Sequence, residues 1–431
     1  MTNRQLKTAA TGINGQLTVP GDKSISHRAV MLGSIATGET AIYGLLDSDD
    51  VRNTLGAMQQ LGVTVDWYDD RVVVHGRPLT TLTEPDGPLD MGNSGTSTRL
   101  LMGLLANQSF PMTFVGDASL STRPLARVID PLTKMGARFV STNHRLPVTT
   151  MPGFGLHGIH YRLPVASAQV KSALILAGLQ AEGETVITEP LATRDHTERM
   201  LQQFGVAVAR DGQDIIVTPN TALTGTTINV PGDISSAAFW IVAALLVPHS
   251  ELRLTGVGIN PTRDGILRLL RRMGAVIELD NVIAEGEPTA DLIVRTQALQ
   301  GTAITSEDIP TAVDEIPMLV LAATQALGDT LITGAQELHV KETDRIATVT
   351  TQLNKLGANI EAREDGFLVH GGTPLHVEEP TVVDSSGDHR IGMMLAIAAL
   401  LTDGEVALAN ADSVSVSYPS FFADLERLVE D

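Results

Sequence analysis

The 431-residue sequence predicts a mixed α/β fold built from about six similar repeats. An apolar helix end, then Gly, then a small residue that opens an apolar strand recurs five times along the chain. The steps between the recurring glycines are 74, 69, 69 and 83 residues, so the C-terminal FFADLERLVED would end a sixth copy. The recurring glycines are Gly62, Gly136, Gly205, Gly274 and Gly357.

Each copy belongs to a longer pattern that alternates helix and strand. A polar segment rich in Ser, Thr, Gly or Asn opens an apolar helix of about ten residues, and a Gly-Glu-Thr or similar turn leads into a strand. Instances of this turn lie in the segments from Gly33, Leu176, Leu321 and Leu401. A second helix then ends at the recurring glycine, which we expect at the C′ position with φ above zero.

A second repeat divides the chain into two halves. VPGDKSISHRA begins at Val19, and VPGDISSAAFW begins 211 residues later at Val230. Pro-Gly pairs form turns and mark the points where the chain crosses between the halves. We therefore expect one domain over 21–231 and another assembled from 1–20 and 232–431. The active site is expected in the interdomain cleft, a usual place for a ligand.

Composition excludes several classes of function. The formal net charge of −20 argues against nucleic acid as a partner, and 43% hydrophobic residues are ordinary for a soluble protein. The absence of cysteine excludes disulfides, thiolate metal ligands and a catalytic thiol. The sequence has no signal-peptide h-region and no apolar stretch of about 18 residues. We therefore expect a cytoplasmic protein with no membrane partner. We also expect a monomer.

The lysines are few and unevenly placed. Three of the six, Lys23, Lys171 and Lys341, stand inside polar motifs rather than on ordinary helix faces. An acidic chain whose scarce lysines are gathered in motifs favours a local cationic pocket for a small anion.

The motif GDKSISHRA places polar side chains at a Pro-Gly turn before an apolar run. A helix N-terminus with a hydroxyl, N–H groups and flanking cations is a ready anion site. The alternative is that Ser24 or Ser26 simply caps the helix. The second half has Ile234 in the place of Lys23, so the cations are the added feature and favour anion binding. The polar side chains are Lys23, Ser24, His27 and Arg28.

GNSGTSTRLLMGLLA carries a similar but weaker signal. Gly95 lets a ligand approach the backbone closely, and Arg99 follows about one helical turn later. A capped turn would explain the same residues. In STRPLARVIDPL, Arg123 precedes a proline and is therefore expected in an extended segment.

SAQVKSALILAGL has the same design, with Ser167 and Gln169 at the cap. Lys171 either reaches the site or lays its stem along the apolar face of the helix.

The segment RDHTERML admits two interpretations. Asp195 and Glu198 fit a capping-box variant, which would leave Arg194 outside the helix, where it can meet an anion. His196 and Glu198 do not form a metal site, because no third ligand follows at ligand spacing. We expect no metal and no cofactor.

VKETDRIATV predicts a helix over 340–349 on which Lys341 and Arg345 lie four residues apart. Like charges at this spacing cost roughly 0.2 to 0.5 kcal/mol unless an anion bridges them. Glu342 stands among these cations as a carboxylate, and a solvated charge run is the alternative.

Two more helix starts carry charges. Asp314 and Glu315 directly precede an apolar helix with Pro317 near its first turn. In SSGDHRIGMMLAIAAL, Asp388 is expected to be the N-cap, and Arg390 to project with His389 from the helix start.

The cations at motif boundaries are more numerous than one carboxylate requires. Two anionic substrates, at least one of them phosphorylated, would account for them. Asp314 and Glu342 are then available for proton transfer among the cations. The cations are Lys23, Arg28, Arg99, Arg123, Arg194, Lys341, Arg345 and Arg390.

Together the motifs resemble the 5-enolpyruvylshikimate-3-phosphate synthase family of enolpyruvyl transferases. GDKSISHRA, LLDSDDVRNTL, GNSGTSTR, STRP, SAQVKSA, KETDR and DHR occur in the order of the family and span almost the whole chain. The resemblance implies a two-domain inside-out α/β barrel of six βαβαββ repeats. It also implies transfer of the enolpyruvyl group of phosphoenolpyruvate to the 5-hydroxyl of shikimate 3-phosphate, with release of phosphate, in aromatic amino acid biosynthesis.

The resemblance also implies roles for individual residues. Asp314 would accept the 5-hydroxyl proton, while Glu342 with Lys23 would protonate the methylene carbon. Shikimate 3-phosphate would be held by Lys23, Ser24, Arg28, Ser167, Gln169, Arg194, Asp314 and Lys341. Phosphoenolpyruvate would be held by Lys23, Gly95, Arg123, Gln169, Arg345 and Arg390.

The chain departs from the family pattern in one place. Val416 stands where many members have a lysine before the C-terminal aromatic-Pro pair, here Tyr418-Pro419. RDHTE, SAQVK and NPTR resemble the subgroup less sensitive to glyphosate, whereas Gly95 lacks the methyl group that crowds this inhibitor in some resistant members.

Three other functions remain as alternatives. An enolpyruvyl transferase acting on UDP-N-acetylglucosamine typically carries a loop cysteine, which this chain lacks. An RNA 3′-phosphate cyclase-like enzyme shares related βαβαββ units and would have a more basic surface. A non-catalytic repeat scaffold would not explain cations at helix starts beside Asp314 and Glu342.

Overall fold

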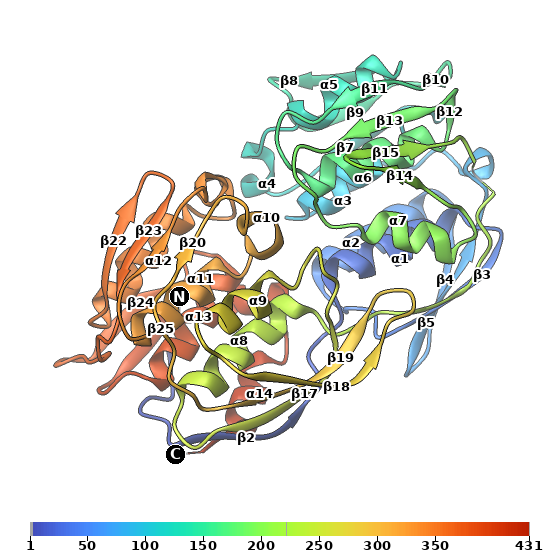
Figure 1. Cartoon of the computed structure of the whole chain (residues 1–431). Helices are drawn as coiled ribbons and strands as arrows, with labels where there is room; N and C mark the ends of the chain where they lie inside the picture. The colour runs from blue at the N-terminus through green and yellow to red at the C-terminus, as the bar shows by residue number, and fades with distance from the viewer. Residues whose placement is uncertain (1–2, 221, 431) are drawn as a thin grey trace. The chain divides into compact units, whose positions relative to one another are not determined.

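The computed structural model describes residues 3–220 and 222–430. Its internal contacts divide the chain into two compact units (Figure 1). One unit runs from Gly21 to Val230, and the other combines the residues up to Pro20 with those from Pro231 onward. Each unit has its own hydrophobic core.

Three helices at the centre of each unit are buried on nearly every side. Their residues beyond the first turn are mostly apolar around the whole circumference, and such helices are stable only where other elements cover them completely. In the 21–230 unit these central helices are α1 (Lys23–Ile35), α3 (Gly95–Leu104) and α6 (Ala168–Gly178). In the other unit they are α8 (Ile234–Leu246), α11 (Ile316–Gln325) and α13 (His389–Leu400).

A second set of helices is amphipathic and buries one face. Five of them end at the recurring glycines, whose φ angles are 92°, 105°, 88°, 95° and 94°. The expected left-handed C′ residue is therefore confirmed at all five positions. The set comprises α2 (Asp49–Gln60), α5 (Ala126–Lys134), α7 (His196–Gln203), α9 (Gly265–Arg272), α12 (Arg345–Lys355) and α14 (Phe421–Leu428).

The sheets of the 21–230 unit share one topology, in which a parallel pair of strands continues into an antiparallel hairpin. The second sheet shows the complete βαβαββ repeat. Strands β6 and β7, which α3 connects along the chain, pair in parallel, and β8 and β9, which follow α5, form the antiparallel hairpin. In spatial order the first sheet is β16 (Thr227–Asn229), β3 (Gly38–Tyr43), β5 (Arg71–Gly76), β4 (Thr64–Trp67). The second is β6 (Leu89–Asp90), β7 (Met112–Val115), β9 (Arg145–Thr150), β8 (Phe139–Thr142). The third is β11 (His160–Arg162), β13 (Thr185–Thr188), β15 (Asp214–Val217), β14 (Ala209–Asp211), accompanied by the short pair β10 (Leu156–His157) and β12 (Ala181–Glu182).

The other unit repeats this arrangement with small changes at its ends. One sheet has five strands, β18 (Ile277–Ile283), β19 (Thr289–Arg295), β17 (Glu251–Gly258), β2 (Gly12–Leu17) and β26 (Val429–Glu430). The next is β20 (Ala303–Ile304), β21 (Thr330–Ile332), β23 (Gly366–His370), β22 (Asn359–Arg363). The third is β1 (Arg4–Gln5), β25 (Val406–Ala409), β24 (Thr381–Asp384).

The strand before each Pro-Gly pair belongs to the opposite unit from the helix that follows it. Strand β2 pairs in parallel with β17, Leu17 opposite Leu254, although α1 comes next along the chain. Strand β16 pairs in parallel with β3, Ile228 opposite Ile42, although α8 comes next. This exchange of strands explains why one unit is discontinuous in sequence.

Central helices covered by outer sheets confirm the predicted inside-out α/β fold class. No helix in the described part of the chain is long and apolar enough to cross a membrane.

Two glycines of the 21–230 unit test the C′ assignment. A Cβ atom would meet nothing within 4 Å at either position, but Gly205 has φ +88° and Gly56 lies inside α2. Gly205→Ala should lower the free energy of unfolding by about 1 kcal/mol, because an L-residue is strained in the left-handed region. Gly56→Ala should raise it by about 0.5 to 1 kcal/mol through helix propensity. Urea denaturation measures both, and equal effects would contradict the assignment.

Candidate active site

Helix α1 begins at Lys23 and is capped by Asp22. The Asp22 carboxylate accepts the N–H of Ile25 at 2.9 Å. The interpretation that Ser24 or Ser26 caps this helix is therefore wrong, because the extended backbone of Asp22 after the Pro-Gly turn already provides the cap. Lys23 and Ser24 stand in the first turn instead.

Lys23 has a carboxylate partner that the sequence did not reveal. Its Nζ lies 2.5 Å from Oδ2 of Asp50, whose side chain is 5% exposed in the first turn of α2. Asp50 belongs to an acidic run that opens an amphipathic helix, and this run was the available signal. Only tertiary structure brings the two helix starts together.

The Arg28 guanidinium is buried and bonds across three elements. Its Nε and Nη2 donate to Thr197 Oγ1 and Ser172 Oγ, each at 2.8 Å, and its Nη1 donates to the carbonyl of Ser24 at 2.9 Å. These three hydrogen bonds fix the orientation of the guanidinium.

His27 lies in the same turn and is fully buried. Its Nδ1 lies 2.8 Å from Thr54 Oγ1. Burial, with a further contribution from the Lys23 and Arg28 cations, lowers the pKa of His27 to about 3, although Asp50 opposes this shift. His27 is therefore a neutral structural residue of the cluster at neutral pH.

The start of α3 lies against two arginines. Ser94 caps the helix by accepting the N–H of Ser97 at 3.1 Å, so Gly95 is its first residue. A Cβ atom on Gly95 would lie 2.5 Å from Nη1 of Arg99 and 3.7 Å from Nη1 of Arg123. The missing side chain therefore leaves room for both guanidinium groups beside the helix N-terminus.

Gln169 joins this group from α6. Arg99 Nη1 donates to Gln169 Oε1 at 2.8 Å, and Gln169 Nε2 donates to Thr96 Oγ1 at 3.0 Å. Ser167 caps α6 as predicted, accepting the N–H of Val170 at 3.4 Å. The N-termini of two central helices are thus linked through polar side chains.

The start of α7 differs from the sequence interpretation. Asp195 makes no side-chain cap bond; its carboxylate accepts from Arg199 Nε at 2.8 Å. Glu198 is directed to Lys171 instead, with its Oε1 2.8 Å from Nζ. The capping box is therefore wrong, because a fully buried ammonium competes for the Glu198 carboxylate.

Lys171 also departs from both predicted roles. Its side chain is 0% exposed and lies between two carboxylates, so it neither reaches an open site nor presents its ammonium to solvent. Arg194 is half-buried in the loop just before α7.

The other unit gathers charges around Arg345. Helix α12 begins at Arg345, not near residue 340, because Asp344 caps it by accepting the N–H of Ala347 at 3.1 Å. Lys341 follows the 3-10 helix Gln336–Val340, and its Nζ lies 3.4 Å from Glu337 Oε1. The predicted clash between Lys341 and Arg345 on one helix is therefore wrong.

Three carboxylates surround the buried Arg345 guanidinium. Its Nε lies 2.8 Å from Asp388 Oδ2, its Nη2 2.6 Å from Glu342 Oε2, and its Nη1 3.7 Å from Asp314 Oδ1. Burial opposes the charge of Arg345, but the Glu342 and Asp388 carboxylates outweigh burial and raise its pKa. Arg390 Nη2 lies 3.5 Å from Asp314 Oδ2.

Helix caps position these groups. Asp388 caps α13 as predicted, accepting the N–H of Arg390 at 2.9 Å, while its carboxylate also holds Arg345. Glu315 is the N-cap residue of α11, which fixes Asp314 just before the helix. Burial raises the pKa of Glu315, and the neighbouring Asp314 adds to this shift, whereas Arg263 opposes it.

The structure thus collects the predicted residues into separate groups. In the 21–230 unit, Arg99 bonds to Gln169, and both Arg99 and Arg123 have a guanidinium nitrogen beside Gly95. In the other unit, Asp314, Glu342, Arg345 and Arg390 form one cluster. The contacts described for Lys341 do not join it to that cluster.

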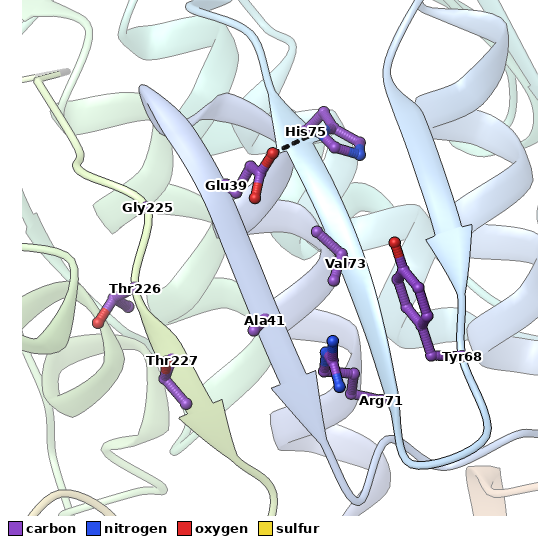
Figure 2. Close-up of a pocket in the computed structure, with 9 residues that line it drawn as sticks. All are labelled: Glu39, Ala41, Tyr68, Arg71, Val73, His75, Gly225, Thr226 and Thr227. Carbon is purple, nitrogen blue, oxygen red and sulfur yellow. Dashed lines mark ion pairs between the residues drawn. The ribbon is translucent and has the colours of Figure 1, made fainter.

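A surface pocket of about 540 Å³ lies elsewhere, over the outer face of the sheet that contains β3 and β5 (Figure 2). His75 lies 3.4 Å from Glu39 and 2.8 Å from Asp66, and Arg71 lies over the Tyr68 ring. The basic side chains of this pocket, His75 and Arg71, thus already face carboxylates or an aromatic ring. None of the predicted site residues lines it. The pocket is lined by Glu39, Ala41, Tyr68, Arg71, Val73, His75, Gly225, Thr226 and Thr227.

The buried Arg345 should be essential for stability. Arg345→Met would leave the fully buried Asp388 carboxylate without its main cation and should lower the free energy of unfolding by about 3 to 5 kcal/mol. The matched variant Arg363→Met removes an exposed pair with Glu361 and should cost less than about 1 kcal/mol. Urea denaturation compares them, and a similar loss in both would refute the assigned role of Arg345.

His27 should make stability depend on pH. The pKa of His27 is lowered to about 3 in the folded state, whereas in the unfolded chain it is about 6.5. Between these two pH values His27 binds a proton only in the unfolded chain, so a fall in pH favours unfolding. The His27 contribution to the free energy of unfolding should be nearly constant well above pH 6.5 and fall below it, with a slope that approaches about 1.4 kcal/mol per pH unit. Denaturation of wild type and His27→Asn between pH 7 and 5 tests this. Parallel stability curves would show that His27 titrates normally.

Comparison with known proteins identifies the family of this chain. A model of the family EPSP synthase (3-phosphoshikimate 1-carboxyvinyltransferase) matches residues 7–425. The chain is 56% identical over 428 residues to a Leuconostoc citreum protein named 3-phosphoshikimate 1-carboxyvinyltransferase, with 99% of each chain covered.

Solved structures agree with this match. EPSP synthase from Acinetobacter baumannii is 42% identical, with a TM-score of 0.89 over 99% of this chain and 98% of that one. The enolpyruvyl transferase NikO from Streptomyces tendae shares the fold at 17% identity, with a TM-score of 0.81 over 99% of this chain and 98% of that one. The chain therefore belongs to the EPSP synthase (3-phosphoshikimate 1-carboxyvinyltransferase) family.

Proposed function

We propose that this protein transfers the enolpyruvyl group of phosphoenolpyruvate to the 5-hydroxyl of shikimate 3-phosphate and releases phosphate. Family membership over almost the whole chain supports the reaction, as does the name of the Leuconostoc relative. The missing cysteine disfavours the UDP-N-acetylglucosamine transferase, and the net charge of −20 disfavours an RNA 3′-phosphate cyclase. A cytoplasmic monomer is part of the same proposal.

The observation that supports this proposal most directly is an unsatisfied hydrogen-bond donor on the buried Arg345 side chain. Its guanidinium is 1% exposed, yet Nη1 has no hydrogen-bond acceptor among the residues that the structure describes. A buried donor without an acceptor is costly, and a bound carboxylate would satisfy it. Arg345 and the neighbouring Arg390 are therefore assigned to phosphoenolpyruvate, together with Lys23, Gly95, Arg123 and Gln169.

The phosphorylated substrate requires a different set of cations. Arg28 is held in one orientation by hydrogen bonds to three neighbours, and a guanidinium fixed in this way suits the recognition of a phosphate. Ser167 and the α6 N-terminus add a hydroxyl and N–H groups. Shikimate 3-phosphate is assigned to Lys23, Ser24, Arg28, Ser167, Gln169, Arg194, Asp314 and Lys341.

Two carboxylates supply the proton transfers. Asp314, 16% exposed, accepts the proton of the 5-hydroxyl as its oxygen attacks C2 of phosphoenolpyruvate. Glu342, 27% exposed and held by Arg345, delivers a proton to the methylene carbon with the help of Lys23. Removal of a proton from the methyl group of the resulting adduct and expulsion of phosphate then regenerate the double bond.

Each of the two residue sets includes residues of both units, so the proposed reaction requires both units. We propose that the substrates bind in the interdomain cleft expected from the sequence. Holding both reactants in one orientation would lower the barrier by removing the entropy cost of bringing them together.

Phosphate release by the purified protein tests the function. Release should require shikimate 3-phosphate and phosphoenolpyruvate together, so each is omitted in turn. Release from phosphoenolpyruvate alone would indicate a phosphatase, and no release with both would reject the proposed function.

Asp314→Asn tests the assigned base. The variant keeps the size of the side chain and should still bind shikimate 3-phosphate, but turnover should fall at least about 100-fold because the amide cannot accept the proton. Calorimetry measures binding, and phosphate release measures turnover. The exposed Asp412→Asn in the same unit is the control. Wild-type turnover in Asp314→Asn would remove Asp314 from the mechanism.

A further inference from the structure

We propose that Lys171 is a positioning residue that holds the loop carrying Arg194 and so determines the affinity for the phosphate of shikimate 3-phosphate. This inference rests on the proposed function, in which Arg194 binds that substrate. Lys171 itself touches no substrate in the proposal, because its side chain is 0% exposed.

The ammonium of Lys171 contacts three points around the loop. Its Nζ lies 3.2 Å from Oε1 of Glu189, at the start of the loop, and donates to the carbonyl of Thr193 at 3.3 Å. It also lies 2.8 Å from Oε1 of Glu198 in α7, just beyond the loop. One buried cation on a central helix therefore fixes both sides of the segment that contains Arg194.

Glu189 strengthens the same attachment. Its Oε1 accepts the backbone N–H of Thr193 at 3.2 Å and also accepts the Thr193 hydroxyl. Its Oε2 lies 3.3 Å from Arg210 Nη2. Thr193, the residue directly before Arg194, is thus held through its N–H, hydroxyl and carbonyl groups.

The charges of this network balance among themselves. The two glutamates face two cations, Lys171 and Arg210. Lys171 and Arg210 are therefore the cations that hold these two carboxylates in place around the loop.

Stability alone is a weak explanation for such a network. A well-packed apolar group is often as stable as a buried ion pair, whereas an ion pair with several bonds restricts geometry. A lysine with contacts on both sides of one loop therefore indicates that the network selects one loop conformation, and the proposed ligand residue on that loop is Arg194.

The first test is the variant Lys171→Met, which keeps the unbranched stem and removes the ammonium. The KM for shikimate 3-phosphate should rise about tenfold, while kcat stays within about threefold and the KM for phosphoenolpyruvate is unchanged. Lys134→Met, at an exposed site of the same unit, is the matched control and should leave all three constants unchanged. Should Lys171→Met fail to fold, Glu198→Gln weakens the same contact with a smaller change and should shift the same constant in the same direction.

A double-mutant cycle separates positioning from general damage. Calorimetry gives the Kd of shikimate 3-phosphate for Arg194→Ala, Lys171→Met and the double variant. If Lys171 acts through Arg194, the double variant should bind within about twofold of Arg194→Ala. The inference would be overturned if the increase in Kd of the double variant equalled the product of the increases in the two single variants. An unchanged Kd in a folded Lys171→Met or Glu198→Gln variant would also overturn it.

Calorimetry also distinguishes this inference from the proposed function. Wild-type protein that binds shikimate 3-phosphate without catalysing its reaction would reject the function and leave the Kd values to decide the role of Lys171. Wild-type protein that neither binds nor reacts would reject both.

Discussion

Complete burial of six apolar helices is the constraint on which the rest of the structure depends. Helices such as α8 and α11 have no polar face, so sheets must cover them on the outside. Only their first turns can then carry exposed polar groups without cost. The repeats therefore place functional side chains at helix N-termini, where the backbone N–H groups also favour anions.

Arg28 in α1 and Arg345 at the start of α12 are held by very different partners. Arg28 donates hydrogen bonds to two hydroxyl groups and one backbone carbonyl, which orient its guanidinium. Arg345 is surrounded by carboxylates, of which Glu342 and Asp314 are also the proposed proton carriers. The same guanidinium thus orients the acid and the base and keeps one donor for the substrate carboxylate. Preorganised charges of this kind stabilise a transition state without the cost of rearrangement.

Local signals in the sequence predicted well, and contacts between distant segments did not. The C′ glycines and the caps Ser167 and Asp388 depend on a few neighbouring residues, and all were predicted correctly. The helix start at residue 340 was wrong because Asp344, four residues later, caps α12. The capping box at Asp195 was wrong because the Glu198 carboxylate pairs with Lys171 instead. Asp50 was missed because its pairing with Lys23 joins two helices whose packing no local pattern specifies.

The most direct test of enolpyruvyl transfer follows the bridging oxygen of phosphoenolpyruvate. The purified protein would receive shikimate 3-phosphate and phosphoenolpyruvate labelled with ¹⁸O between C2 and phosphorus, and mass spectrometry would locate the label. Attack at C2 forms the adduct, and expulsion of phosphate from it breaks the carbon–oxygen bond. The label should therefore appear in the released phosphate while the shikimate product gains the enolpyruvyl carbons. Label retained on a three-carbon product would mean that the phosphorus–oxygen bond breaks, which would contradict the transfer.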